Sequence, residues 1–222
     1  MHTLYALSLS IAMNIPYLDA NQQRVTTSTP QTIGIAGAHG NLGRELVQQT
    51  LNRGCKPIAF VRRDEYIYPP TPYGSLSALE RASDPFMNID MFMTTDLPSK
   101  LPYMDAVVFC MSGQPFTVDT STEVVSDVCS KLHDNTRVCL ISAWGVGDSI
   151  KQSNAGIKAM RNWYLRSTYS EKEKQESLVS EFAHHLILRP KVLSFASIPM
   201  NTISTTRYDL ARNVLNWCNE TP

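Results

Sequence analysis

The sequence has no excess of charge of either sign. Its 222 residues carry 20 Lys and Arg against 20 Asp and Glu, so the formal net charge is +0. A balanced chain lacks the basic surface through which proteins bind nucleic acids or anionic membranes. We therefore expect a small-molecule substrate and no nucleic-acid partner. A monomer or homodimer is expected as a separate prediction.

The cysteines lack the spacing of a metal site. No C-x-x-C pair or Cys/His ligand pattern occurs among Cys55, Cys110, Cys129, Cys139 and Cys218, so no metal is expected. Three of them lie in or beside apolar segments, which is typical of reduced, buried thiols. This usage fits a reducing compartment and predicts a cytoplasmic protein.

The first thirty residues lack the features of a membrane span or of a targeting signal. The apolar stretch from Leu4 to Leu18 is short and is interrupted by polar residues and by Pro16. No basic residue precedes it, and Arg24 is a single arginine where a mitochondrial presequence has several. We treat residues 1–30 as a flexible extension, with a cleaved targeting peptide as the alternative, and residues 31–220 as one domain.

Glycine is concentrated where an apolar run gives way to a helical pattern, between Thr32 and Gln48. In a dinucleotide-binding turn the first glycine permits the tight turn, the second lets a pyrophosphate approach the backbone, and the third lets helix and strand pack closely. The helix N-terminus adds free N–H groups for the anion. The alternative is a glycine-rich turn without a ligand. The predicted cofactor-binding residues here are Gly37, His39, Gly40, Asn41, Leu42 and Gly43.

Short apolar runs alternate with segments of helical periodicity along the rest of the chain. This alternation is typical of an α/β fold with a doubly wound parallel sheet, the Rossmann fold. Residues 66–74 predict an irregular loop and residues 75–82 a short helix. Further strands are predicted at 57–61, 88–93, 105–111, 137–141 and 185–190. Helices are predicted at 118–132 and 208–218, and residues 151–167 and 169–182 predict one or two helices that pack on the sheet.

The carboxyl ends of the predicted strands supply further candidates, because doubly wound sheets bind their ligands there. Arg62 and Arg63 follow the second strand, where a basic residue accepts the 2′-phosphate of NADP. NADP(H) is therefore the preferred cofactor and NAD(H) the alternative, since Asp64 and Glu65 follow and an acid there would face a ribose. The predicted cofactor-binding set also contains Asp96, Leu97, Met111, Ser112, Gly113, Ser142, Arg189 and Pro190.

Ser142 is the candidate catalytic residue. It follows the fifth predicted strand, where a hydroxyl would meet the nicotinamide or the substrate. The alternative is an ordinary cap at a strand end.

Seven segments, in order along the chain, carry a resemblance to one family. They are GAHGNLG at 37–43, FVRR at 60–63, DAVVF at 105–109, ISAWGVGDS at 141–149, KQE at 174–176, LILRP at 186–190 and ISTTRYDLA at 203–211. Together they resemble the atypical short-chain dehydrogenase/reductases, with NmrA-like and biliverdin/flavin-reductase-like members. The resemblance implies a Rossmann fold, NAD(P) along the glycine turn, an arginine on the 2′-phosphate, and a substrate pocket over the nicotinamide with a small C-terminal lid region.

The sequence departs from this family at its usual acid, a Tyr with a Lys four residues later. Tyr164 is followed at that spacing by Thr168, and Tyr169 by Glu173. A lysine such as Lys172 or Lys174 would have to partner a hidden acid in space. Two functions are compatible with the absence of this tyrosine-lysine pair. One is an NADPH-dependent reductase of a flavin, quinone or carbonyl, and the other is a non-catalytic NAD(P) sensor or interaction module of the NmrA-like kind. A sugar-nucleotide epimerase is disfavoured, because it would need the tyrosine.

Overall fold

A computed structural model describes residues 31–61, 89–111, 120–152, 155–163, 166–190, 193–194 and 205–219. Several predictions from the sequence lie outside these ranges and stay predictions. They concern the extension at 1–30, the loop at 66–74, the short helix at 75–82, most of the lid region, and the candidates Arg62, Arg63, Ser112 and Gly113.

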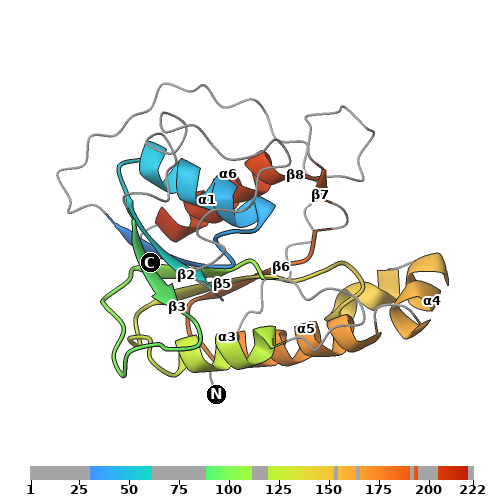
Figure 1. The fold of residues 1–222 in the computed structure, drawn as a ribbon. Helices are drawn as coiled ribbons and strands as arrows, with labels where there is room; N and C mark the ends of the chain where they lie inside the picture. The colour runs from blue at the N-terminus through green and yellow to red at the C-terminus, as the bar shows by residue number, and fades with distance from the viewer. Residues whose placement is uncertain are drawn as a thin grey trace, which may run out of the picture.

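Six parallel strands form one sheet in the order β3-β2-β1-β4-β5-β6 (Figure 1). From β1 the chain moves outward through β2 to β3 and then returns to place β4 on the other side of β1. This reversal is the point at which doubly wound sheets open a crevice at the carboxyl ends of their strands. The strands are β1 Thr32–Ala36, β2 Lys56–Val61, β3 Asp90–Met93, β4 Ala106–Phe109, β5 Arg137–Ile141 and β6 His185–Leu188.

Helices cover both faces of the sheet. α1 (Asn41–Asn52) and α6 (Arg207–Asn219) lie on one face, and α3 (Ser121–Cys129) and α5 (Arg166–Val179) on the other (Figure 1). A 3₁₀ helix, η3 (Gly147–Gln152), and α4 (Ala155–Trp163) connect β5 to α5. The predicted doubly wound α/β fold is confirmed.

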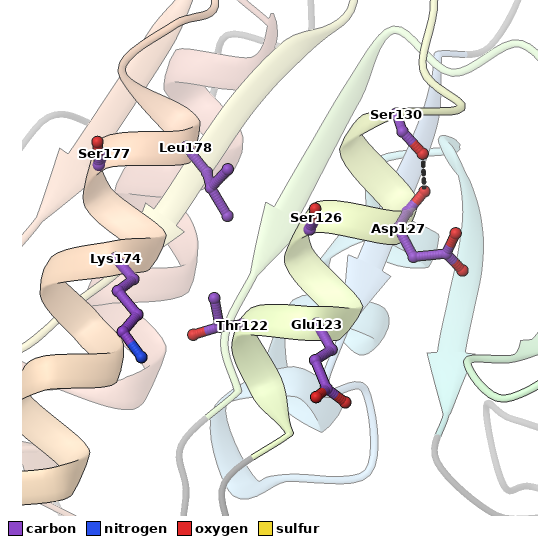
Figure 2. Close-up of a pocket in the computed structure, with 8 residues that line it drawn as sticks. All are labelled: Thr122, Glu123, Ser126, Asp127, Ser130, Lys174, Ser177 and Leu178. Carbon is purple, nitrogen blue, oxygen red and sulfur yellow. Dashed lines mark hydrogen bonds between the residues drawn. The ribbon is translucent and has the colours of Figure 1, made fainter.

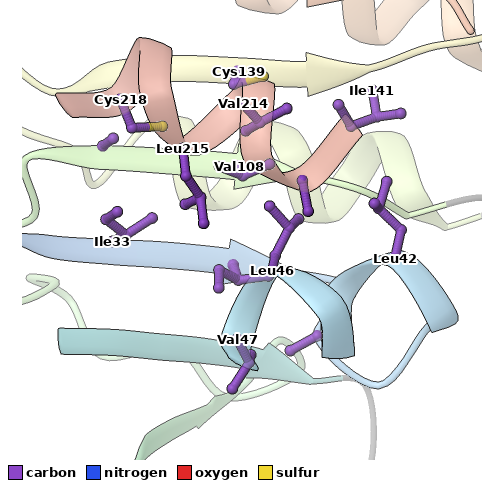
Figure 3. Packing of buried hydrophobic residues seen from close by; sticks show 14 of the residues in the cluster. Ile33, Leu42, Leu46, Val47, Val108, Cys139, Ile141, Val214, Leu215 and Cys218 are labelled. Atoms are coloured by element: carbon purple, nitrogen blue, oxygen red, sulfur yellow. The ribbon is translucent and has the colours of Figure 1, made fainter. Parts of the chain in front are cut away.

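Alternate residues of the strands point to opposite faces of the sheet and form two hydrophobic cores, one on each face. On one face Ile33 of β1 packs with Leu46 of α1 and Leu215 of α6, all three with no exposed surface (Figure 3). On the other face Phe60 and Phe109 are equally buried in the cluster beneath α3 and α5. Full burial of one such side chain contributes roughly 1.5–3 kcal/mol, so these cores hold the strand ends in register.

Some boundaries differ from the sequence prediction. The third strand begins at Asp90 and not at residue 88, and the sixth ends at Leu188 and not at 190. α3 ends at Cys129, short of the predicted 132, where the main chain changes to i→i−3 bonds: Lys131 N–H donates to Val128 O (3.0 Å) and Leu132 N–H to Cys129 O (3.3 Å). A two-stranded parallel pair, β7 (Leu193–Ser194) with β8 (Thr205–Thr206), was not predicted, since two-residue strands leave no periodic pattern.

No disulfide forms, and no membrane span is found in the described ranges. All five cysteines are free; Cys139 and Cys218 are buried, and Cys55, Cys110 and Cys129 are half-buried. Within the described ranges no helix is long and apolar enough to cross a membrane.

Candidate cofactor site

The turn between β1 and α1 uses two of its three motif glycines for packing. Gly37 has φ +87°, and a Cβ there would lie 2.9 Å from Cγ of Met111 and 3.1 Å from main-chain atoms after β4. A Cβ on Gly43 would overlap Gly37 O and lie 2.6 Å from Cα of Ala38. These two glycines therefore let β1 approach β4 and let α1 approach the turn.

Gly40 has no comparable reason to be glycine. Its φ of −65° and ψ of 159° suit any residue, and among the described residues an added Cβ would meet only Gly37 O, at 3.2 Å. The residue is exposed. Backbone conformation does not require glycine at this position, and the contact with Gly37 O is milder than those at Gly37 and Gly43, while the absence of a side chain would let a ligand approach the main chain.

The N-terminus of α1 lies directly behind Gly40. No side chain in the described part of the chain caps it, and its first turn carries no acidic residue. Its first N–H groups and the positive end of the helix dipole are thus offered to an anion. Asn41 is exposed beside Gly40, whereas Leu42 is buried in the core, so Leu42 can serve a ligand only through its main chain. His39 is half-buried in the same turn.

The turn after β3 holds Asp96 and Leu97 at the same edge of the sheet. Thr94 N–H donates to Val61 O at the end of β2 (2.8 Å), and Asp96 N–H donates to Met93 O (3.1 Å). The Asp96 side chain is exposed, whereas Leu97 is half-buried against the α3-side core. Asp96 is thus available to a ligand at this edge, and Leu97 is partly a packing residue.

The carboxyl ends of β4 and β5 bring Met111 and Ser142 to this edge. Met111 is buried against Gly37, which places its main chain beside the glycine turn. Ser142 is 6 % exposed, and its N–H donates to Leu188 O (2.8 Å). The Ser142 hydroxyl is buried and finds no hydrogen-bond partner within the described ranges. A buried hydroxyl without a hydrogen-bond partner lowers the stability of a protein by about 1–3 kcal/mol. The Ser142 hydroxyl is therefore suited to form a hydrogen bond with a ligand.

Arg189 and Pro190 hold the loop that follows β5. The Arg189 guanidinium donates from Nε and Nη2 to the two carboxylate oxygens of Glu176 on α5, at 2.8 and 2.6 Å. This hydrogen bonding raises the pKa of Arg189 above its usual value, against an opposing effect of burial. Pro190 O accepts from Trp144 N–H (3.2 Å). Their predicted contact with a cofactor stays a prediction.

Tyr169 does not point its phenol at the end of a strand. The Oη atom donates to Trp144 O (2.9 Å), and the residue is 6 % exposed. One turn later on α5, Lys172 is 3 % exposed and donates from Nζ to Met111 O (2.6 Å) and to Ile141 O (3.2 Å). Tyrosine and lysine therefore share a helix face, but they contact different carbonyl groups.

A family model for NAD(P)H-binding proteins matches residues 37–212. The chain belongs to this NAD(P)H-binding family. The match covers the glycine turn, all the strands after β1 and the start of α6, and it confirms the resemblance to the atypical short-chain dehydrogenase/reductases. The family match supports a nicotinamide cofactor as the ligand of this protein.

Solved structures share this fold at low sequence identity. An epimerase/dehydratase described as NAD-dependent, from Bacillus halodurans, is 19% identical over 86% of this chain and 88% of its own, with a TM-score of 0.57. ChuY, an anaerobilin reductase from Escherichia coli O157:H7, is 17% identical over 85% and 91%, also with a TM-score of 0.57. A short-chain dehydrogenase/reductase from Veillonella parvula is 13% identical over 85% and 86%, with a TM-score of 0.56. No curated protein sequence matches the chain.

A pocket of about 730 Å³ lies elsewhere, between α3 and α5 (Figure 2). Thr122 and Ser126 of α3 face Lys174 and Leu178 of α5 across it, and none of the predicted site residues lines it. It runs between two helices on one face of the sheet and is separate from the edge formed by the strand ends.

The sequence analysis missed the burial of Lys172. The α5 segment is strongly polar, and nothing in its pattern separates Lys172 from Lys174, which is exposed and paired with Glu171 at 2.7 Å. Only the packing of α5 on the sheet distinguishes the two lysines. The departure from the tyrosine-lysine spacing was visible in sequence, and the geometry now gives Tyr169 a main-chain partner.

Proposed function

We propose that the protein binds NADP(H) across the β1–α1 turn and reduces a small electron-poor substrate such as a flavin, quinone or carbonyl. The proposal rests chiefly on Gly40, an exposed glycine that its backbone conformation does not require and whose added Cβ would meet a milder contact than at Gly37 or Gly43. The uncapped N-terminus of α1 supports it, since that terminus suits a pyrophosphate. Gly37, His39, Asn41 and the main chain of Leu42 and Gly43 would complete the cradle.

The preference for the phosphorylated cofactor is proposed from Arg62 and Arg63. They directly follow Val61, the last residue of β2, and β2 is the neighbour of β1 in the sheet. In this fold the end of that strand meets the adenosine ribose, where a guanidinium pairs with a 2′-phosphate. Asp96, after the adjoining β3, would lie toward the adenine.

A nicotinamide cofactor, when bound, supplies hydride, and the protein's task is to orient it and exclude water. Ser142 would hydrogen-bond the nicotinamide amide or a substrate carbonyl through its buried hydroxyl. Tyr169 already donates to Trp144 O, so we assign it no proton transfer. A flavin or quinone takes its proton from water, which suits a site without a dedicated side-chain acid.

The second candidate is a non-catalytic NAD(P) sensor or interaction module. The same commitment of Tyr169 to Trp144 O favours it, because a sensor needs the cofactor cradle and no acid. For either function we propose a monomer or homodimer in the cytoplasm, with residues 31–220 as the binding domain.

One experiment separates these functions. The purified protein is titrated with NADPH and NADH by calorimetry, and NADPH oxidation is then followed with FMN, menadione and aldehyde acceptors. We expect binding of NADPH together with turnover of at least one acceptor. Binding without turnover supports the sensor, and the absence of nucleotide binding refutes both functions.

A further inference from the structure

Lys172 is a buried lysine that donates to two main-chain carbonyls at the edge of the sheet. Its Nζ atom donates to Met111 O, two residues beyond β4, and to Ile141 O, the last residue of β5. A third contact runs to Oε1 of Gln175 (3.0 Å), one turn later on α5. An ammonium group has three N–H donors and no acceptor, so these three oxygens match its donors.

Gln175 extends this network to the start of α3. Its Nε2 atom donates to Oγ of Ser121 (2.6 Å), and both residues are buried. Ser121 is the first residue of α3, and Met111 is the last described residue after β4. Lys172 and Gln175 therefore hold the two ends of the connection between β4 and α3.

Both carbonyls belong to the predicted cofactor edge. Met111 packs against Gly37 of the glycine turn, and the peptide that carries Ile141 O also carries the N–H of Ser142. That N–H is bonded to Leu188 O in β6. Loss of the Lys172 contacts would loosen Met111 and Ile141 from α5 where the nicotinamide half of a cofactor is expected to lie.

We propose that Lys172 is a positioning residue: it ties the ends of β4 and β5 to α5 and so sets the main chain and the Ser142 hydroxyl for a nicotinamide cofactor. This proposal rests on the proposed function. Lys172 acts through Met111 and Ile141, since its Nζ atom donates to the main-chain oxygen of each.

The test compares Lys172→Met with Lys174→Met. The second variant removes a lysine from the same helix that is exposed and bound only to Glu171 among the contacts described here. Deuterium exchange is measured without nucleotide at the N–H groups of Cys110 and Ser142, which are bonded to Ala36 O and Leu188 O, and at the central β1 and β4 amides. NADPH dissociation constants are measured on the same proteins.

We expect Lys172→Met to speed exchange at Cys110 and Ser142 about tenfold or more, with the central strands unchanged, and to weaken NADPH binding by a similar factor. Lys174→Met should match the wild type in both. Uniformly faster exchange, or local loosening with unchanged NADPH affinity, would overturn the positioning role.

Two further outcomes are decisive. If the wild type does not bind NADPH, the proposed function fails, and with it the cofactor part of this inference, while the exchange data still decide whether Lys172 holds the strand ends. If Lys172→Met does not fold, Gln175→Met replaces it, because that change removes one Lys172 partner and the Ser121 contact. It should loosen the same two amides by a smaller factor, and no change there refutes the proposal.

Discussion

The Tyr169 hydroxyl donates to the main-chain oxygen of Trp144, 2.9 Å away, and joins α5 to the loop after β5. The same loop is held at Trp144 N–H by Pro190 O (3.2 Å). Tyr169 therefore fixes the carboxyl edge of the sheet, and its phenol is committed to a structural contact.

We predict that Tyr169→Phe affects stability more than catalysis. Loss of one neutral hydrogen bond should lower the free energy of unfolding by about 0.5–1.5 kcal/mol, while kcat for NADPH oxidation stays within about twofold. Urea unfolding and steady-state kinetics measure the two effects. Tyr103→Phe, at a 57% exposed residue, is the control and should change neither. A thousandfold fall in kcat would identify Tyr169 as the missing acid.

Gly40→Val should abolish NADPH binding without unfolding the protein. The valine side chain would fill the space in front of the main chain, whereas among the described residues its Cβ would meet only Gly37 O, at 3.2 Å. Gly43→Ala is the contrasting variant, since its Cβ would overlap the turn and should destabilise the fold itself. Calorimetric titration and thermal unfolding are compared for both. Normal NADPH affinity in Gly40→Val contradicts the central assignment.

In the glycine turn, some features could be predicted from the sequence and others could not. Its three glycines, the strand before them and the helix after them were predicted, because each leaves a local signature within a few residues. The sequence could not show that each of the three glycines has a different structural role. For example, Gly37 is constrained by contact with Met111, a residue distant in sequence. Sequence spacing places residues along the chain, whereas this constraint arises only when β4 pairs with β1.

Lys172 and Lys174 illustrate the same limit on α5. The helix was predicted at 169–182 and is observed at Arg166–Val179. Its polar composition gives a weak periodicity, so the buried face could not be assigned from the sequence. Two lysines of equal appearance in sequence thus have opposite environments.

Arg62→Ala should reduce the preference for NADPH over NADH. A guanidinium on the 2′-phosphate contributes roughly 1.5–3 kcal/mol, or about ten- to more than a hundredfold in affinity. Arg63→Ala should have a smaller effect of the same kind. Dissociation constants for both nucleotides are measured on the wild type and the two variants. Equal affinities of the wild type for NADPH and NADH would refute the 2′-phosphate role.

The buried thiols predict a loss of stability at alkaline pH. Burial raises the pKa of Cys218 from 9.0 to about 12 and raises the pKa of Cys139 well above the same value. The unfolded chain therefore releases these protons at a lower pH than the native protein. Stability is fully present below about pH 9 and falls above it, by up to about 1.4 kcal/mol per pH unit for each such thiol.

Cys218→Ala should flatten this dependence. Urea unfolding at about pH 8 and about pH 10 gives the difference in unfolding free energy for each protein, so any constant cost of the substitution cancels. Cys55→Ala is the control, because Cys55 is half-buried and should alter the dependence less. An identical pH dependence in wild type and Cys218→Ala would contradict the burial argument.

Ser142→Ala should have opposite effects on stability in the absence and in the presence of NADPH. The hydroxyl is buried without a hydrogen-bond partner in the described ranges, so its removal should leave the unliganded protein equally stable or more stable by up to about 1 kcal/mol. With NADPH present the effect should reverse, because the hydroxyl then gains its partner.

The rise in Tm on adding NADPH should be smaller in the variant, and kcat/KM should fall about two- to tenfold, as expected for the loss of one hydrogen bond between neutral groups. Thermal unfolding with and without NADPH measures the reversal directly. If the variant is less stable without NADPH and keeps the full nucleotide-induced rise in Tm, then Ser142 is a strand-end cap and not a ligand of the cofactor.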